Sequence, residues 1–377
     1  MTHRDFLRRA QRGLLLGLLP LGLLWAATAS AATLTDLAGR QVQVPDKVEH
    51  ILLGEGRMIY SLSLLEGRNP FARLAGWQGD FRGLDVQGYE AYHKAFPEAD
   101  KVPLVGGTSA ETFSVEKALA VHPDLAIMAL SGGHGPSPDS EAVKQLEAAG
   151  VAVIFVDFSD HPLSNTVPSM RLLGQALGRE QQAEAFIAFY QQSLARVSDT
   201  LAKAGKVQQP KIFVDMLAGL QDCCGSPGTG NFGEMIKLAG GRNIADGRIP
   251  GPIGVLNVEY ILSSDPDLYV ATGVFAAGQG GVTLGYSATL QQARDSLRQA
   301  AQRPPLNELR AVREGNVHGL WHIFYDSPEH LIAVQALAKW LHPELFKDLD
   351  PDQTRRELYQ RFMPIPASGV FATSLQP

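Results

Sequence analysis

Several arginine and aromatic side chains stand just beyond short apolar runs, where a strand would end and a binding loop would begin. An arginine guanidinium pairs with acidic oxygens through parallel hydrogen bonds, and an aromatic face stacks on flat or cationic groups. These residue types suit a site for an anionic, often aromatic small molecule, although each aromatic side chain could instead pack in a core. The candidates are Arg57, Trp77, Phe81, Arg82, Tyr89, Phe275, Tyr286, Trp321 and Tyr325.

Three histidines, His134, His318 and His322, could bind a metal ion. The spacing of His318 and His322 would place both on one face of a helix, but the strand-like residues 316–318 and the following Gly319 argue against a helix there. Recognisable zinc sites also need more ligands close together than this chain offers. We therefore predict no metal site and no cofactor, and direct ligation by one of these histidines stays an open alternative.

The two cysteines, Cys223 and Cys224, are adjacent. They cannot link distant parts of the chain, so the fold must depend on its hydrophobic cores rather than on disulfides. A vicinal disulfide and a pair of reduced thiols are both compatible with the sequence.

The sequence lacks the motifs of common enzymes. It contains no G-x-S-x-G elbow, no H-E-x-x-H and no Walker A sequence, so we predict a protein without catalytic residues and keep an exported hydrolase only as an alternative. A formal net charge of −6 and a pI near 5.9 argue against a nucleic-acid partner, which requires a basic face.

Apolar runs bounded by glycine, proline or aspartate alternate with helical patterns, which predicts two α/β lobes around mostly parallel sheets. Between them, apolar residues recur every three or four positions and predict a helix over residues 179–202, about 36 Å long. We place the first lobe at 32–160, a linking helical segment at 161–205 and the second lobe at 206–377. The predicted strands lie at residues 48–53, 73–77, 123–130 and 151–156 in the first lobe, and at 211–216, 267–273 and 316–320 in the second.

The N-terminus has the three regions of an export signal: basic residues, an apolar run at 14–25 and small residues at 29–31. The run is too short for a permanent membrane span. We predict a signal peptide at 1–31 and a soluble mature protein of about 346 residues in the periplasm, with no cysteine near Ala31 to carry a lipid. His3 replaces the first arginine of a twin-arginine signal, so the Sec route is favoured and the Tat route stays open.

Several phrases occur in the order typical of one protein family. Residues 114–127 (SVEKALAVHPDLAI) combine an acidic helix start with a strand, and residues 239–245 (AGGRNIA) and 255–268 (VLNVEYILSSDPDL) repeat the theme. The stretches 311–317 and 337–346 complete the set. Over most of its length the chain resembles the iron-siderophore and cobalamin (Fe/B12) binding proteins of ABC importers. That resemblance implies a class III fold, in which one long rigid helix joins two Rossmann-like lobes.

The resemblance also implies a function. The protein would capture a ferric siderophore or similar iron chelate between its lobes, with cobalamin, haem or a metal ion as alternative ligands. Glu116 and Glu259, one per lobe, would dock onto a membrane permease coupled to a cytoplasmic ATPase, unless they are merely helix-start carboxylates. A monomer is expected. The long segment 79–101 and the cysteine pair depart from the family pattern and leave the ligand uncertain.

Overall fold

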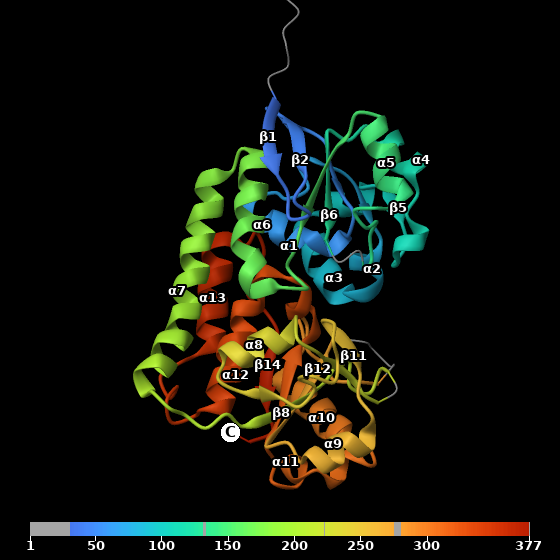
Figure 1. The fold of residues 1–377 in the computed structure, drawn as a ribbon. Coiled ribbons are helices and arrows are strands. Elements are labelled where there is room, and N and C mark those ends of the chain that lie inside the picture. The colour runs from blue at the N-terminus through green and yellow to red at the C-terminus, as the bar shows by residue number, and fades with distance from the viewer. Residues whose placement is uncertain (1–30, 131–132, 222, 275–279, 377) are drawn as a thin grey trace, which may run out of the picture.

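The computed structural model describes residues 31–130, 133–221, 223–274 and 280–376, and it arranges them in two α/β lobes, one above the other in Figure 1. The two-lobed α/β architecture predicted from the sequence is confirmed. Apart from Ala31, the predicted export signal lies outside the described residues. Within the described ranges, no helix combines the length and the hydropathy that crossing a bilayer requires.

The first lobe contains a parallel five-stranded sheet in the order β5-β4-β3-β6-β7. Every residue of β6 and β7 is buried, as expected for a parallel sheet that is covered on both faces. An antiparallel pair, β1 and β2, precedes the sheet. The elements are β1 (Ala31–Thr35), β2 (Gln41–Pro45), β3 (Ile51–Leu53), α1 (Ile59–Glu66), β4 (Leu74–Gln78), α2 (Asp80–Leu84), α3 (Val86–Ala95), β5 (Leu104–Gly106), α4 (Val115–Ala120), β6 (Leu125–Ala129), α5 (Glu141–Ala148) and β7 (Ala152–Val156).

The second lobe contains a five-stranded sheet in the order β10-β8-β12-β13-β14, parallel except for the edge strand β14. A short antiparallel pair, β9 and β11, lies outside this sheet. The elements are β8 (Lys211–Asp215), β9 (Gly225–Pro227), α8 (Phe232–Leu238), β10 (Arg242–Asn243), β11 (Ile253–Val255), α9 (Val258–Ser264), β12 (Leu268–Gly273), α10 (Leu290–Ala301), α11 (Arg310–Arg313), β13 (Val317–Trp321), α12 (Leu331–Leu341), α13 (Pro351–Phe362) and β14 (Ala372–Ser374).

Two helices, rather than one, connect the lobes. After β7, α6 (Pro162–Leu177) rises beside the first lobe and ends at Gly178, whose left-handed backbone reverses the chain. The 25-residue α7 (Glu180–Ala204) then runs back to the second lobe, a path of about 37 Å. The long helix expected from the apolar spacing is therefore present, and its buried face includes Phe186, Tyr190 and Val197.

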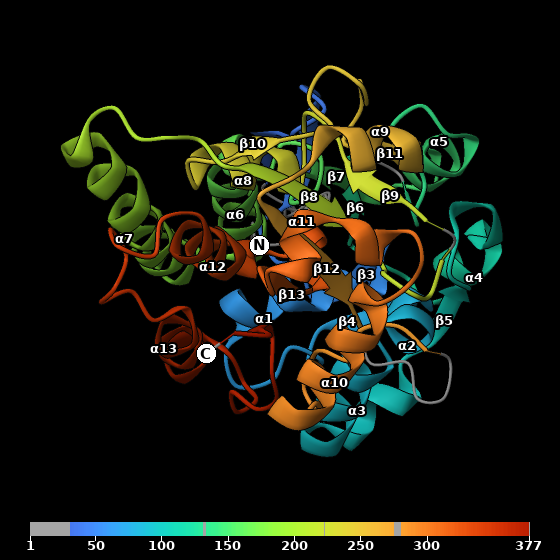
Figure 2. The same ribbon diagram turned by 90° about the horizontal axis from the view of Figure 1, so that it is seen from below.

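The lobes also meet through packed side chains. Tyr60 of α1 stacks on Tyr286 of the second lobe with 6.4 Å between ring centroids, and it meets Trp321 edge-on at 5.6 Å. Figure 2 shows α7, α12 and α13 gathered on one side of the molecule, where α13 contacts both α1 and α7. Because these aromatic rings are almost fully buried, the two lobes share a hydrophobic contact that resists wide opening.

Candidate ligand-binding cleft

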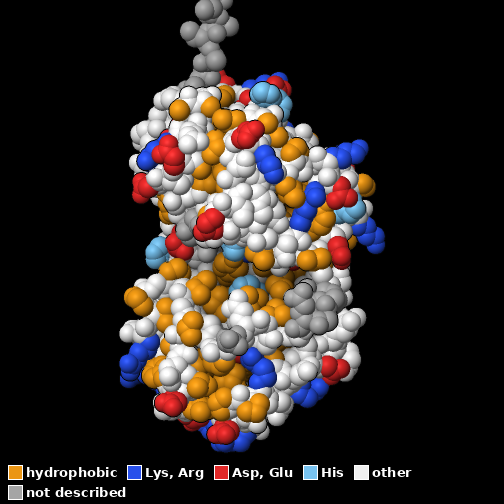
Figure 3. Space-filling view, turned by 90° about the vertical axis from the view of Figure 1, so that its right-hand side faces the viewer, with side chains coloured by type: hydrophobic (Ala, Val, Ile, Leu, Met, Phe, Trp, Pro, Cys, Tyr) orange, Lys and Arg blue, Asp and Glu red, His pale blue; other side chains and the backbone are white. Residues whose placement is uncertain are grey.

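A cavity of about 670 Å³ lies between the two lobes. Figure 3 shows the molecule hollowed at mid-height, with hydrophobic and histidine side chains inside the hollow. Loops that follow strands β3, β4 and β6 meet loops that follow β8, β12 and β13, as expected for parallel sheets whose carboxyl ends face one another. The lining residues are Arg57, Gly83, Leu84, Val86, Gln87, Glu90 and His134 from the first lobe, and Met216, Leu217, Leu220, Gln221, Gly225, Ile253, Val274, His322, Ile323 and Tyr325 from the second.

The walls of this cleft are largely apolar. Leu84 and Val86, at the junction of α2 and α3, remain 39% and 44% exposed, and Ile253 of β11 remains 46% exposed. Single exposed aliphatic side chains are common on protein surfaces, but several around one cavity form an apolar patch of the kind that marks a binding site. Their position on both walls of one cavity indicates that a ligand with apolar surface would cover them.

Arg57 forms the charged floor of the cleft and ties the lobes together. Its Nε lies 3.0 Å from Asp80 Oδ2 in its own lobe. Its Nη1 donates to the Tyr325 hydroxyl at 2.7 Å, and its Nη2 lies 3.2 Å from Asp326 Oδ2, both in the second lobe. The residue is only 1% exposed. The guanidinium is thus paired with the buried Asp80 on one side and the partly buried Asp326 on the other, as a buried charge requires.

A third carboxyl, Glu55, completes this cluster. Its Oε2 is 3.8 Å from Arg57 Nη2, and its Oε1 accepts a hydrogen bond from the His134 backbone N–H at 3.1 Å. Burial, together with the Asp326 carboxylate, raises the pKa of Glu55 to about 8. Glu55 thus holds its proton more tightly than an exposed glutamate does, and Arg57 lies between the carboxyl groups of Asp80 and Asp326.

A chain of hydrogen bonds continues from Arg57 along the floor. The Tyr325 hydroxyl accepts from Arg57 and lies 3.3 Å from His134 Nε2. His134 Nδ1 lies 2.9 Å from the Thr108 carbonyl oxygen, which can only accept, so the imidazole proton stands on Nδ1 and Nε2 accepts from Tyr325. This relay holds Tyr325 and His134 in fixed orientations on the cavity wall.

His322 lies beside this relay, whereas His318 does not. His322 Nδ1 is 2.9 Å from the Thr272 hydroxyl, and burial lowers the pKa of His322 to about 3, so the ring stays neutral. His318 stacks on Trp340 at 4.4 Å, away from the cavity. Across the ranges described above, no three His, Cys, Asp or Glu side chains are arranged to hold a metal ion.

Two of the predicted ligand-binding residues line the cavity: Arg57 and Tyr325. Three others, Trp77, Phe81 and Trp321, are 0% exposed and are absent from its lining. Their rings pack against other aromatic side chains in the core. The structure thus places these three rings in the core and not on the cavity wall, because strand-end segments supply core residues as well as cavity residues.

Tyr286, Arg82 and Tyr89 are also turned away from this cavity. Tyr286 is 4% exposed, and its hydroxyl pairs with that of Tyr359 at 2.8 Å. Arg82 donates to the Ala99 carbonyl at 2.7 Å and lies over the Tyr89 ring at 4.8 Å. These contacts engage the groups that were expected to meet a ligand. Phe275, the ninth candidate, lies outside the described residues.

Little in the amino-acid sequence indicates that the walls of the cleft are apolar. Gln87 and Glu90 follow Val86 on the first turns of α3, in the segment 79–101, whose predicted ligand contacts are Phe81, Arg82 and Tyr89 instead. Leu217 and Leu220 follow β8, just beyond the predicted strand 211–216. The signal that could have found them is the presence of large aliphatic side chains in loops, where polar residues are usual.

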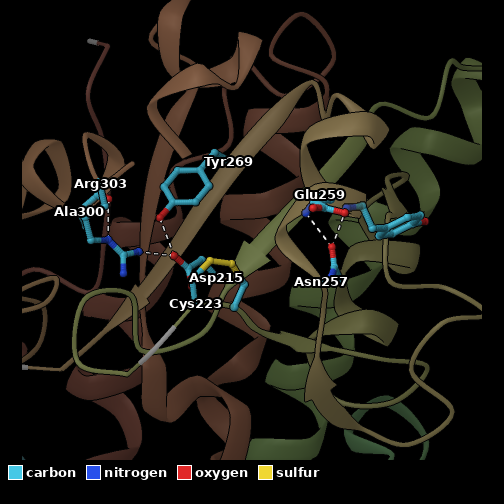
Figure 4. The surroundings of a disulfide bond; sticks show 9 residues. Asp215, Cys223, Asn257, Glu259, Tyr269, Ala300 and Arg303 are labelled. Carbon is cyan, nitrogen blue, oxygen red and sulfur yellow. Dashed lines mark hydrogen bonds and ion pairs between the residues drawn. A yellow bond between two sulfur atoms is a disulfide. The ribbon is translucent and has the colours of Figure 1, made fainter. Parts of the chain in front are cut away.

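Cys223 and Cys224 form a vicinal disulfide close to the cleft. Cys224 is buried and Cys223 is exposed, and the next residue, Gly225, lines the cavity. Figure 4 shows the disulfide beside Asp215, whose carboxylate pairs with Arg303 at 2.5 Å and accepts from Tyr269 at 2.8 Å. The sequence is compatible with either a vicinal disulfide or two reduced thiols, and the structure contains the disulfide.

The two predicted docking glutamates occupy equivalent positions. Glu116 lies in the first turn of α4 behind the cap residue Ser114, and Glu259 lies in the first turn of α9 behind Asn257, as seen for Glu259 in Figure 4. Both are exposed, and neither forms an ion pair with a residue that the structure describes. Glu116 and Glu259 therefore form a matched pair of exposed carboxylates, one on each lobe.

The fold and cleft match known proteins. The chain is 25% identical to the TroA-like periplasmic binding protein FepB from Veillonella parvula, with 91% of this chain and 99% of that chain covered and a TM-score of 0.81. Molybdate-bound MolA from Haemophilus influenzae gives 17% identity, 90% and 99% coverage and a TM-score of 0.70. A periplasmic haem-binding protein from Pseudomonas aeruginosa is 23% identical, with 79% of this chain and 94% of that chain covered and a TM-score of 0.55. A search of curated proteins found no match.

A family model described as periplasmic binding protein matches residues 84–321, more than half of the chain. The segment includes most of the residues that line the cleft. Proteins of this family are not enzymes, which confirms the expectation drawn from the missing catalytic motifs. They serve ABC transporters, which implies a permease partner. This protein therefore belongs to the Fe/B12 periplasmic binding protein family and is the solute-binding component of an ABC transporter.

Proposed function

We propose that this protein captures an iron chelate, such as a ferric siderophore, in the cleft between its lobes and delivers it to the permease. The observation that carries the proposal is the cavity of about 670 Å³ shared by both lobes. Its size falls within the range of about 300–1,000 Å³ that is usual for small-molecule sites. The ligand would thus bridge the lobes.

The absence of a metal-binding cluster from the described residues supports a preassembled ligand. A chelate fills the coordination sphere of iron with its own oxygens, so the protein has to recognise only the outer surface of the complex. The apolar walls around Leu84 and Ile253 would cover hydrocarbon or ring surface. Tyr325, His134 and His322 would supply a few polar contacts at the floor.

The delivery step rests on Glu116 and Glu259. A free carboxylate on each lobe can pair with basic residues of a permease, and two such contacts fix the orientation of the docked protein. The permease in turn would pass the ligand inward at the expense of ATP hydrolysed by a cytoplasmic ATPase. We propose that the protein acts as a monomer in the periplasm after removal of residues 1–31.

Two measurements test the ligand assignment. Native mass spectrometry of protein isolated from its own periplasm should reveal a bound species with the mass of an iron chelate. Titration of ligand-free protein with ferric chelates should quench tryptophan fluorescence saturably, at one chelate per protein, and leave the chelate chemically unchanged. Binding of haem with a shifted Soret band, and of no ferric chelate, would instead assign the cleft to haem.

A further inference from the structure

The cleft offers a ligand no unpaired positive charge. Arg57 is the only arginine or lysine among the described residues that line it, and its three guanidinium nitrogens lie against Asp80, Tyr325 and Asp326. From residue 31 onward, the residues outside the described ranges, 131–132, 222, 275–279 and 377, include no arginine or lysine in the sequence.

Turning Arg57 away from its carboxylate partners toward an anionic ligand would cost considerable free energy. Asp80 is 0% exposed, and the Asp326 side chain is 13% exposed. If Arg57 turned toward a ligand, both carboxylates would lose their partner in a buried setting, which is strongly destabilising. The guanidinium is therefore committed to holding the lobes together.

Glu90 is the one exposed, uncompensated charge on the cavity wall as described. It lies on α3, and its carboxylate makes no ion pair or hydrogen bond with a described residue. Lys94, one helical turn further, shares a neighbouring cavity with Glu90 but does not line this one, and no ion pair joins the two side chains. Glu90 thus adds a carboxylate to a cleft whose single cation among the described residues, Arg57, is already paired with two others, Asp80 and Asp326.

Building on the proposed function, we propose that this cleft selects uncharged or cationic iron chelates with an apolar periphery and discriminates against polyanionic ones, with Glu90 as a specificity-determining residue. A trianionic complex would lose part of its hydration on entering a cleft lined by Leu84, Val86 and Ile253, and it would meet no unpaired cation there. An uncharged complex covers the same side chains at no such cost, and a pendant ammonium group would be attracted by Glu90.

The test compares three ferric complexes of similar size in tryptophan-quenching titrations at low salt. The first is an uncharged tris-hydroxamate, the second a tris-hydroxamate with a pendant ammonium group, and the third a trianionic tris-catecholate. Wild-type protein should bind the trianion at least roughly a hundredfold more weakly than the other two. In Glu90→Gln, the cationic complex should lose about tenfold in affinity, while the uncharged complex should change less than about twofold.

Glu180→Gln is the matched control. Glu180 is an exposed glutamate at the start of α7 and does not line the cavity, so its replacement removes the same charge without touching the site. It should leave all three affinities unchanged. Tight binding of the trianion, or equal effects of the two substitutions, would refute charge selection and leave the proposed function standing. Failure of all three complexes to bind would reject the proposed function, and the selectivity with it.

Discussion

Replacing Arg57 by methionine should destabilise the fold more than it alters ligand recognition. Methionine keeps much of the length and the apolar stem of the side chain but removes the charge. The substitution leaves Asp80 and Asp326 without their shared cation at a position that is almost fully buried. It also breaks the hydrogen bond from Arg57 to Tyr325, which joins the two lobes.

The magnitude follows from the burial of these groups. Removing one partner of a buried ion pair typically costs about 3–5 kcal/mol. Asp80 still accepts from the backbone N–H groups of Gly56 at 2.5 Å and Arg57 at 3.2 Å, which favours the lower end of that range. For a chain of this size, each kcal/mol corresponds to about 2 °C in Tm, so we expect Tm to fall by roughly 6–8 °C.

Urea unfolding followed by circular dichroism at pH 8 measures this effect, and Arg82→Met is the matched control. Arg82 makes one hydrogen bond to Ala99 and a cation–π contact with Tyr89, so its loss should cost about 1–2 kcal/mol. The deficit of the Arg57 variant should shrink at pH 5, because protonation relieves the unpaired carboxylates. A loss below about 1 kcal/mol at pH 8 would show that Arg57 does not hold the lobes together.

Three further predictions follow from the same structure. Burial raises the pKa of Glu329 to about 7, so this carboxyl stabilises the folded state below its unfolded pKa, and the stabilisation is lost as the pH rises toward 7. Glu329→Gln should therefore reduce the change in unfolding free energy between pH 4.5 and 7 by on the order of 2–3 kcal/mol. An unchanged pH dependence would contradict this. Replacing Glu116 and Glu259 together by alanine should preserve ligand affinity and abolish cellular uptake of the labelled ligand, and normal uptake would remove them from the docking surface. Because Tyr60 packs on Tyr286 and Trp321, ligand binding should leave the radius of gyration in small-angle X-ray scattering nearly unchanged, whereas a clear contraction would reveal a wide hinge.

The fold could be predicted from the sequence because its signals are local. Short apolar runs such as residues 123–130 and 267–273 correspond to the fully buried strands β6 and β12. The apolar spacing over 179–202 matches α7, which covers Glu180–Ala204. The same spacing does not reveal α6, because the linking segment 161–205 contains two helices and the chain reverses between them at Gly178.

The cleft was harder to predict, because a strand-end loop contains both ligand-facing and core-facing side chains. Arg57 and Tyr325 are 268 residues apart in sequence, yet they meet in one hydrogen bond across the lobes. Trp77 and Phe81 also lie at or just beyond the end of a predicted strand, but their side chains pack in the core. No local pattern distinguishes these two outcomes.

The sequence by itself determined the family, the two α/β lobes, the long helix and the location of the cleft at the ends of the strands. Only the tertiary structure decided that Arg57 is ion-paired with both Asp80 and Asp326, and that the walls of the cleft are apolar. The physical reason is that the two properties depend on interactions between residues at different separations along the chain. Secondary structure follows from neighbours in the chain, whereas the charge that a ligand meets depends on side chains which only folding brings within a few ångströms of each other.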